Sequence, residues 1–306
     1  MAAYLVKRLA FTIPVLFGIT VVVFFVVALI PGDAVDAMMT QIKLSADQMA
    51  QLRRQLGLDD PLLVQLGRYL GDLFRGDFGR SVFGYHPVAG LILANLPATV
   101  QLTVAAMVIA MLLGIPLGAL AAVRQNTGWD LLGMFIALVG ISVPGFWLGL
   151  MLIQLFAVGL GWLPITGTGL RPLILPAFAL GVAEAAILAR LTRANMVEAL
   201  REDFVRTARA KGLNQGRVVW RHAFRSTVIP VMTMLGMQFG TLLGGAVVIE
   251  NVFARQGLGT LVTRAVINRD APVVQGVVLV AAAMYVLINL LVDVLYGFLD
   301  PRIRYE

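Results

Sequence analysis

The chain has 306 residues, of which 59% are hydrophobic and only 13% are charged, with a mean hydropathy of +0.87. Soluble domains carry about 25% charged residues, so the composition excludes an ordinary soluble domain and indicates a polytopic membrane protein. The chain has no cysteine, which excludes a disulfide framework and a thiolate site. The formal charge of +7 does not indicate nucleic-acid binding, because the basic residues flank apolar stretches, where membrane topology accounts for them.

The first apolar run extends from about Leu9 to Ile30 and follows a short N-terminus that carries Lys7 and Arg8. A run of about 22 residues is longer than a typical signal-peptide core and long enough to span a bilayer. No clear small-x-small cleavage site ends it. We therefore predict a retained first span with the N-terminus in the cytoplasm.

Residues 31–96 are polar and mixed in charge. Two segments, QMAQLRRQLGL and LLVQLGRYLGDLF, repeat apolar residues at intervals of three and four, which predicts short amphipathic helices. We interpret residues 31–96 as a small external subdomain that lies on the membrane face or on a partner.

Five further spans are predicted, with approximate bounds Ala98–Val123, Leu132–Leu160, Pro172–Leu191, Val228–Glu250 and Gln275–Leu299. With this topology, fourteen basic residues lie on the side of the N-terminus, and only four lie in the two short loops opposite. The positive-inside bias therefore places both termini in the cytoplasm. The predicted fold is all-α, with six transmembrane helices. Its parts are residues 1–30 (N-terminus and first span), 31–96 (periplasmic subdomain), 97–299 (a five-helix core that includes a helix at 202–212) and 300–306 (cytoplasmic tail).

The stretch from Arg190 to Pro230 is the one long polar interval in the second half of the chain. Within it, EDFVRTARAKG predicts a short basic amphipathic helix. Acidic Glu202 and Asp203 open this helix, where negative charge is favourable, and Gly212 can adopt the left-handed conformation that ends it. From these residues alone the stretch is a solvated or lipid-bound cytoplasmic segment, or a docking helix for a soluble partner.

Catalytic and metal-binding motifs are missing from the sequence. The chain has no P-loop motif and only two histidines, which are far apart in sequence, so we predict neither an enzyme nor a metal site. Glu184 lies within the fourth predicted span, where a charge is costly and by default marks a functional site. It could line a translocation path, pair with Arg190 or Arg193, or carry a proton.

Three functions remain open at this point. The chain is the pore subunit of a transporter powered by a separate ATPase, an ion-coupled secondary transporter that uses Glu184, or a structural membrane protein without a pathway. Secondary transporters are often built from internal repeats and carry several buried charges. The sequence shows no convincing repeat and only one clear acidic residue in the middle of a span, which disfavours the second alternative.

The stretches FVRTARAKGL and VVWRHAFRSTVIP resemble the cytoplasmic signature of the permease subunits of bacterial ABC importers. The order of QLGLDDP, GDFGRS, GIPLGALAAV, GGAVVIENVF, RDAPVVQG, NLLVDVLYG and DPRIR is similar to the branch that imports dipeptides, oligopeptides, nickel and glutathione. The resemblance covers nearly the whole chain. LGWLP followed by ILP most resembles the glutathione importers, with a general di- or oligopeptide importer as the alternative. The broader signature has Glu where this chain has Arg206.

This resemblance implies the type I importer permease fold, a bacterial inner-membrane location and a set of partners. The partners are a second, similar permease, two cytoplasmic ATPase subunits that bind ATP-Mg, and a periplasmic or lipid-anchored substrate-binding protein. The short helix is then the coupling helix that docks in a groove of the ATPase. The residues carried over for this role are Asp203, Phe204, Arg206, Thr207, Ala208, Arg209, Ala210, Lys211 and Gly212.

Overall fold

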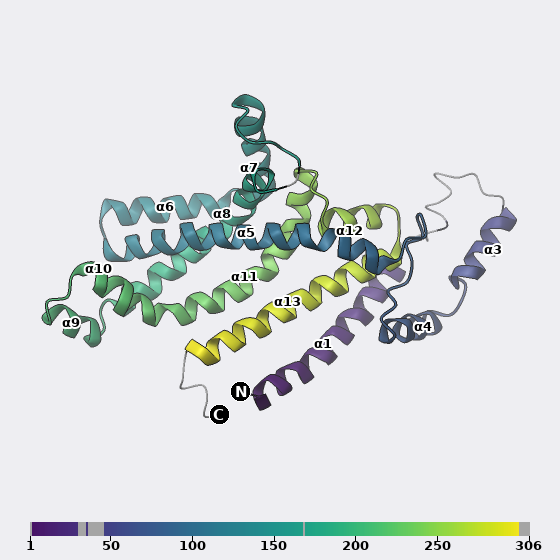
Figure 1. Ribbon diagram of the computed structural model, residues 1–306, viewed down its shortest axis with the longest axis horizontal. Coiled ribbons are helices and arrows are strands. Elements are labelled where there is room, and N and C mark those ends of the chain that lie inside the picture. Colours follow the sequence, from purple (N-terminus) through teal and green to yellow (C-terminus); the bar gives the residue numbers. More distant parts are fainter. Residues whose placement is uncertain (1, 30–34, 36–45, 168, 300–306) are drawn as a thin grey trace. The chain divides into compact units, whose positions relative to one another are not determined.

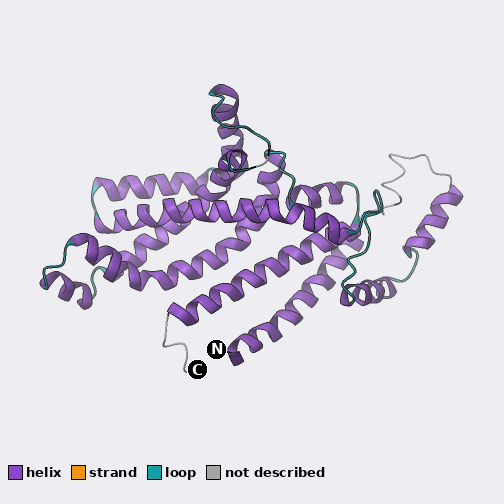
Figure 2. Ribbon diagram, viewed as in Figure 1, coloured by secondary structure: helices purple, strands orange, loops and turns teal. Residues whose placement is uncertain are grey.

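The computed structural model describes residues 2–29, 35, 46–167 and 169–299. Most of the predicted segment between the first span and the amphipathic helices, and the predicted tail 300–306, lie outside the described residues. The described part of the chain is helical and contains no β-strand, only one antiparallel bridge between Arg80 and Pro87 (Figure 2).

Figure 1 shows the described helices in the order in which they follow one another along the chain. In chain order they are α1 (Ala2–Ala28), α3 (Ala46–Leu56), α4 (Leu62–Phe74), α5 (Val88–Val123), α6 (Gly128–Ser142), α7 (Gly145–Leu152), the π-helical segment η1 (Ile153–Gly159), α8 (Arg171–Ala199), α9 (Asp203–Ala210), α10 (Gln215–Arg217), the π-helical segment η2 (Val218–Ala223), α11 (Phe224–Val252), α12 (Leu258–Ile267) and α13 (Ala271–Leu299).

Five of the described helices are long and apolar enough to cross a membrane, and a bent pair of helices brings the number to six. The prediction of an all-α protein with six spans is therefore confirmed. The short helices α3 and α4 confirm the two amphipathic segments. α5 begins at Val88 rather than Ala98, because Val88 and Ile92 are buried and extend its apolar face.

The predicted span Leu132–Leu160 is not one helix. α6 ends at Ser142, and the next helices follow at an angle of 98°. A proline disfavours helical geometry at the residue before it, and Val143 accordingly adopts an extended conformation with ψ of 120° in front of Pro144. The third span is therefore broken at this proline.

The chain forms two compact units. One consists mainly of Thr99–Arg255 together with the segment that begins at Ile288, and the other contains Ala2–Ala98 and Gln256–Leu287. This division differs from the predicted domains, because α12 and the first part of α13 share a buried core with Val88 and Ile92.

Two acidic residues tie distant segments together, one within each unit. Asp270 is 4% exposed and accepts hydrogen bonds from the Ser81 hydroxyl and from the Val82 backbone N–H. Glu250 is fully buried, and its Oε1 accepts a hydrogen bond of 2.6 Å from Thr99 Oγ1. The buried carboxylate of Glu250 therefore connects α11 to α5.

Small residues bring α5 and α8 into close contact. A Cβ atom on Gly114 would lie 2.5 Å from the Ala185 carbonyl oxygen, and one on Gly181 would lie 2.6 Å from the Ala106 carbonyl oxygen. Small residues allow such close helix approach in membranes.

We expect Gly114→Ala to lower the thermal stability of the purified protein, because the added methyl group forces α5 away from α8. Overpacking of this kind costs about 1–3 kcal/mol. Gly244→Ala is the matched control, since nothing lies within 4 Å of a Cβ at that helical position. Melting in mild detergent measures both variants, and equal melting temperatures would contradict the close packing.

Candidate functional site

The polar interval of the second half of the chain folds into the end of α8, the short helix α9, and the segment α10–η2 that leads into α11 (Figure 1). α9 begins after Glu202, which has extended backbone angles (φ −65°, ψ 150°). It ends before Gly212, whose φ of +76° is the left-handed conformation that favours glycine. The predicted helix and its glycine stop are thus present.

One face of α9 is anchored in the protein core. Val205 is fully buried and Ala208 is 4% exposed. The cluster that surrounds them is formed by Ala119 and Ala122 of α5, Met196 and Ala199 of α8, and Val218, Val219 and Ala223 of η2. The short helix is therefore held by the ends of α5 and α8 and by η2, all within one unit. The packing of α9 therefore connects it to the apolar helices that continue from these ends.

The opposite face of α9 is exposed. Phe204 is 44% exposed, and the side chains of Arg206 and Asp203 are 83% and 93% exposed, with 3.6 Å between Arg206 Nη1 and Asp203 Oδ1. Thr207, Arg209, Ala210, Lys211 and Gly212 are also exposed. The result is a basic surface with one large apolar side chain, which we call the α9 surface: Asp203, Phe204, Arg206, Thr207, Arg209, Ala210, Lys211 and Gly212.

Ala208 does not belong to the α9 surface, although we expected its small side chain to approach a partner. Its small size is used inside the chain, where it fits among the ends of the neighbouring helices. The sequence analysis missed Val205, the fully buried anchor of α9. Val205 and Ala208 are three residues apart, which places them on one face of a helix and could have indicated the buried face. Phe204 and Ala208 are four residues apart and also share a face, so spacing alone does not show which pair is buried.

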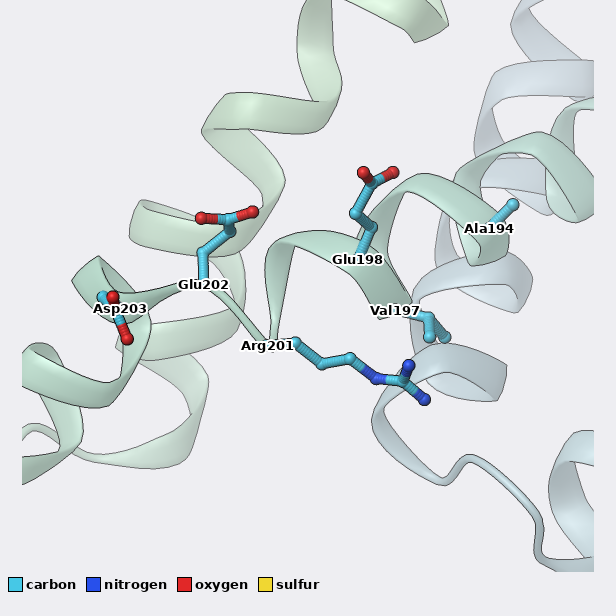
Figure 3. Close-up of a pocket in the computed structure, with 6 residues that line it drawn as sticks. All are labelled: Ala194, Val197, Glu198, Arg201, Glu202 and Asp203. Atoms are coloured by element: carbon cyan, nitrogen blue, oxygen red, sulfur yellow. The ribbon is translucent and has the colours of Figure 1, made fainter.

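An open pocket of about 320 Å³ adjoins the first turn of α9. Its lining comes from the last turns of α8 and the turn into α9: Ala194, Val197, Glu198, Arg201, Glu202 and Asp203. In Figure 3 the carboxylates of Glu198 and Glu202 point to the same side, whereas the guanidinium of Arg201 points away from them. The start of α9 therefore has an acidic recess beside its basic surface.

A largely buried ion pair joins α6 to α8. Arg193 Nε lies 2.6 Å from Asp130 Oδ1, and Arg193 Nη2 lies 2.7 Å from Asp130 Oδ2. The Asp130 side chain is only 4% exposed, and its Oδ2 also accepts a hydrogen bond from the Asn126 backbone N–H. Arg193 thus pairs with Asp130 and not with Glu184, which corrects that sequence interpretation.

Glu184 is 8% exposed and lies where α8 packs against α11. Its backbone carbonyl accepts a hydrogen bond of 3.0 Å from Gln238 Nε2. Glu184 Oε2 and Gln238 Oε1 are buried without a hydrogen-bond partner in the structure. No group of three or more potential metal ligands occurs within the part of the chain that the structure describes.

These features define a class of protein: a polytopic membrane protein with a short helix, exposed on one face, that is packed against the ends of its membrane-spanning helices. The family profile described as binding-protein-dependent transport system inner membrane component matches residues 114–305, and the N-terminal profile of the same membrane components matches residues 1–103. The chain belongs to this family of multi-pass inner-membrane transport permeases, which are not enzymes.

Relatives of known assignment match the whole chain. The dipeptide transport system permease protein DppB of Alkalihalophilus pseudofirmus is 43% identical, and the glutathione transport system permease protein GsiC of Escherichia coli K12 is 46% identical. In both cases the match covers 100% of each chain. The inward-facing MetNI methionine ABC transporter has a similar fold, with a TM-score of 0.60 at 19% identity, covering 69% of this chain and 97% of the other.

Proposed function

We propose that this chain is the permease subunit of an ATP-driven importer that translocates small peptides, either di- and oligopeptides or glutathione. The relatives named for dipeptide and glutathione transport support this substrate class. The single observation that carries the mechanism is the attachment of α9, which is exposed on one face and anchored to three helical segments on the other.

In this proposal the α9 surface docks on a separate ATPase subunit, and ATP-Mg binds to that subunit. Closure of the ATPase pair displaces α9. Because Val205 and Ala208 fix α9 to the ends of α5, α8 and η2, the displacement reaches the spans and alternates access to the pathway. A flexible loop in place of α9 would absorb this displacement and would not transmit it to the spans.

The family implies ATPase and substrate-binding partners. We infer the finer composition of the complex: one further permease of the same kind, two ATPases, and a periplasmic or lipid-anchored binding protein. We also infer that both termini are cytoplasmic. The binding protein then contacts the predicted periplasmic residues 31–96 and the loop Val252–Gly259.

Glu184 is our proposed pathway residue. Since its side chain is buried where α8 meets α11, it reaches a passage only when these helices separate during the cycle. The alternative of an ion-coupled secondary transporter that uses Glu184 has no support from the family, whose members work with binding proteins.

The experiment is purification of the tagged permease in mild detergent, followed by identification of the proteins that accompany it and assay of their ATPase activity. We expect two ATPases and a second permease. We expect Gly212→Pro to lose them or their coupling, because proline fixes φ near −65° while this position has φ of +76°. A permease that purifies alone and moves solute under a proton gradient would overturn the proposal.

Charge reversal on the α9 surface tests the docking itself. We expect the double variant Arg209→Glu/Lys211→Glu to reduce ATPase co-purification, with the greatest loss relative to wild type at low salt concentration, because exposed charges are screened within about 10 Å at 0.1 M salt. The same reversal at Arg75, an exposed basic residue of the other unit, is the control and leaves co-purification unchanged. Equal retention of the ATPase by both proteins would exclude docking through the α9 surface.

A further inference from the structure

α4 is a strongly amphipathic helix. At 100° per residue, the apolar side chains of α4 other than Val64 occupy an arc of about 140°, and Arg68 and Asp72 lie outside this arc. The apolar arc contains Leu62, Leu63, Leu66, Tyr69, Leu70, Leu73 and Phe74. None of the residues of α4 is fully buried, so this apolar face is only partly covered by the chain itself.

α4 is attached at the C-terminal end of a membrane-spanning helix. Tyr69 stacks on Phe24 of α1, with ring centroids 6.0 Å apart and an angle of 22° between the rings. The apolar span of α1 runs over Phe11–Ala28, and Phe24 lies one helical turn, about 6 Å, before its end. The contact therefore holds α4 at the level where α1 leaves the hydrocarbon region.

The two faces of α4 have different surroundings. On the polar side, Gln65 Nε2 donates hydrogen bonds to the backbone carbonyls of Leu58 and Asp60, and Arg68 forms an ion pair of 2.8 Å with Asp60. At the apolar edge away from Tyr69, Leu63 is 74% exposed and Phe74 is 82% exposed. The polar face thus binds its own preceding loop, and the apolar edge is left open at membrane level.

We propose that α4 lies in the bilayer interface beside α1, with Leu63 and Phe74 inserted at the boundary between headgroups and acyl chains. The bilayer that surrounds the apolar span of α1 reaches the position of Phe24, where α4 is attached. The same bilayer can therefore cover the exposed apolar edge of α4. Amphipathic helices with large apolar residues on one face bind such interfaces. The helix carries one basic and one acidic residue, so insertion depends on apolar area rather than on anionic lipid.

The absence of cysteine makes the test direct. Single cysteines at Leu63 and Phe74, with a matched control at Asp72 on the opposite side of α4, are spin-labelled in the full permease complex in liposomes. Collision with oxygen, which concentrates in the bilayer, is compared with collision with a water-soluble nickel chelate. We expect the spin labels at Leu63→Cys and Phe74→Cys to collide more often with oxygen than with the nickel chelate. We expect the reverse for the label at Asp72→Cys.

Two outcomes would overturn the proposal. The first is that the labels at positions 63 and 74 meet the nickel chelate as freely as the label at position 72. The second is that they become shielded only when the substrate-binding protein is added, which would make a protein partner the occupant. The measurement reports membrane depth and not transport, so its result is independent of the proposed substrate.

Discussion

Ala208→Trp is expected to abolish substrate uptake while the protein remains in the membrane. Ala208 is 4% exposed within the cluster that joins α9 to α5, α8 and η2. An indole has no room there, and overpacking costs about 1–3 kcal/mol. The strain is relieved when α9 moves away from the ends of α5, α8 and η2. This movement displaces the whole α9 surface. Each 1.4 kcal/mol lost from docking is about a tenfold loss of affinity.

The measurement is uptake in whole cells, combined with membrane quantification of the permease and ATPase co-purification. Ala208→Ser, which keeps a small side chain, is the control and retains uptake. Wild-type uptake by Ala208→Trp would show that the cluster around Ala208 accommodates a large side chain and that rigid attachment of α9 is not required for transport.

Breaking the ion pair between Asp130 and Arg193 is expected to destabilise the protein strongly. Arg193→Met leaves the nearly inaccessible Asp130 carboxylate without its bidentate partner. Removal of one member of a buried pair costs about 3–5 kcal/mol. The double variant Asp130→Leu/Arg193→Met is expected to recover most of this stability, because both charges are gone. Recovery stays incomplete, since the Asn126 N–H loses its acceptor.

Thermal unfolding of the four members of this mutant cycle in detergent gives the coupling energy. Arg68→Met is the matched control, because it breaks an ion pair of the same kind whose side chains are 54% and 41% exposed. Exposed pairs contribute only about 0–1 kcal/mol. If Arg193→Met lowers the stability as little as Arg68→Met does, the ion pair between α6 and α8 does not stabilise the packing of these helices.

The elements that sequence reasoning recovers best are those whose signal is local. Long apolar stretches must form helices in a bilayer, because every backbone N–H and C=O group needs a partner within the segment, so the six spans follow from composition alone. The start and end of α9 follow from the acidic residues at 202 and 203 and from Gly212. The identity of the family follows from motifs that are contiguous in the chain.

Other features depend on which helices meet in space. Only the approach of α5 to α11 brings the Thr99 hydroxyl to the buried Glu250 carboxylate, to which it donates a hydrogen bond. Glu184 was one predicted partner of Arg193, because both residues lie on the same predicted helix. The structure pairs Arg193 with Asp130 from another helix instead. Periodicity cannot choose between such partners, since it describes one helix at a time.

The amino-acid sequence therefore establishes the membrane-spanning helices, the short helix α9 and the family, because these depend on short-range patterns and on hydrophobicity. The tertiary structure decides which face of α9 is anchored, which charges are paired, and that α4 lies at the end of α1. Those outcomes arise from packing between segments that are far apart along the chain. For Ala208, whose side chain is equally suited to a docking groove and to a crowded core, only that packing determines the role.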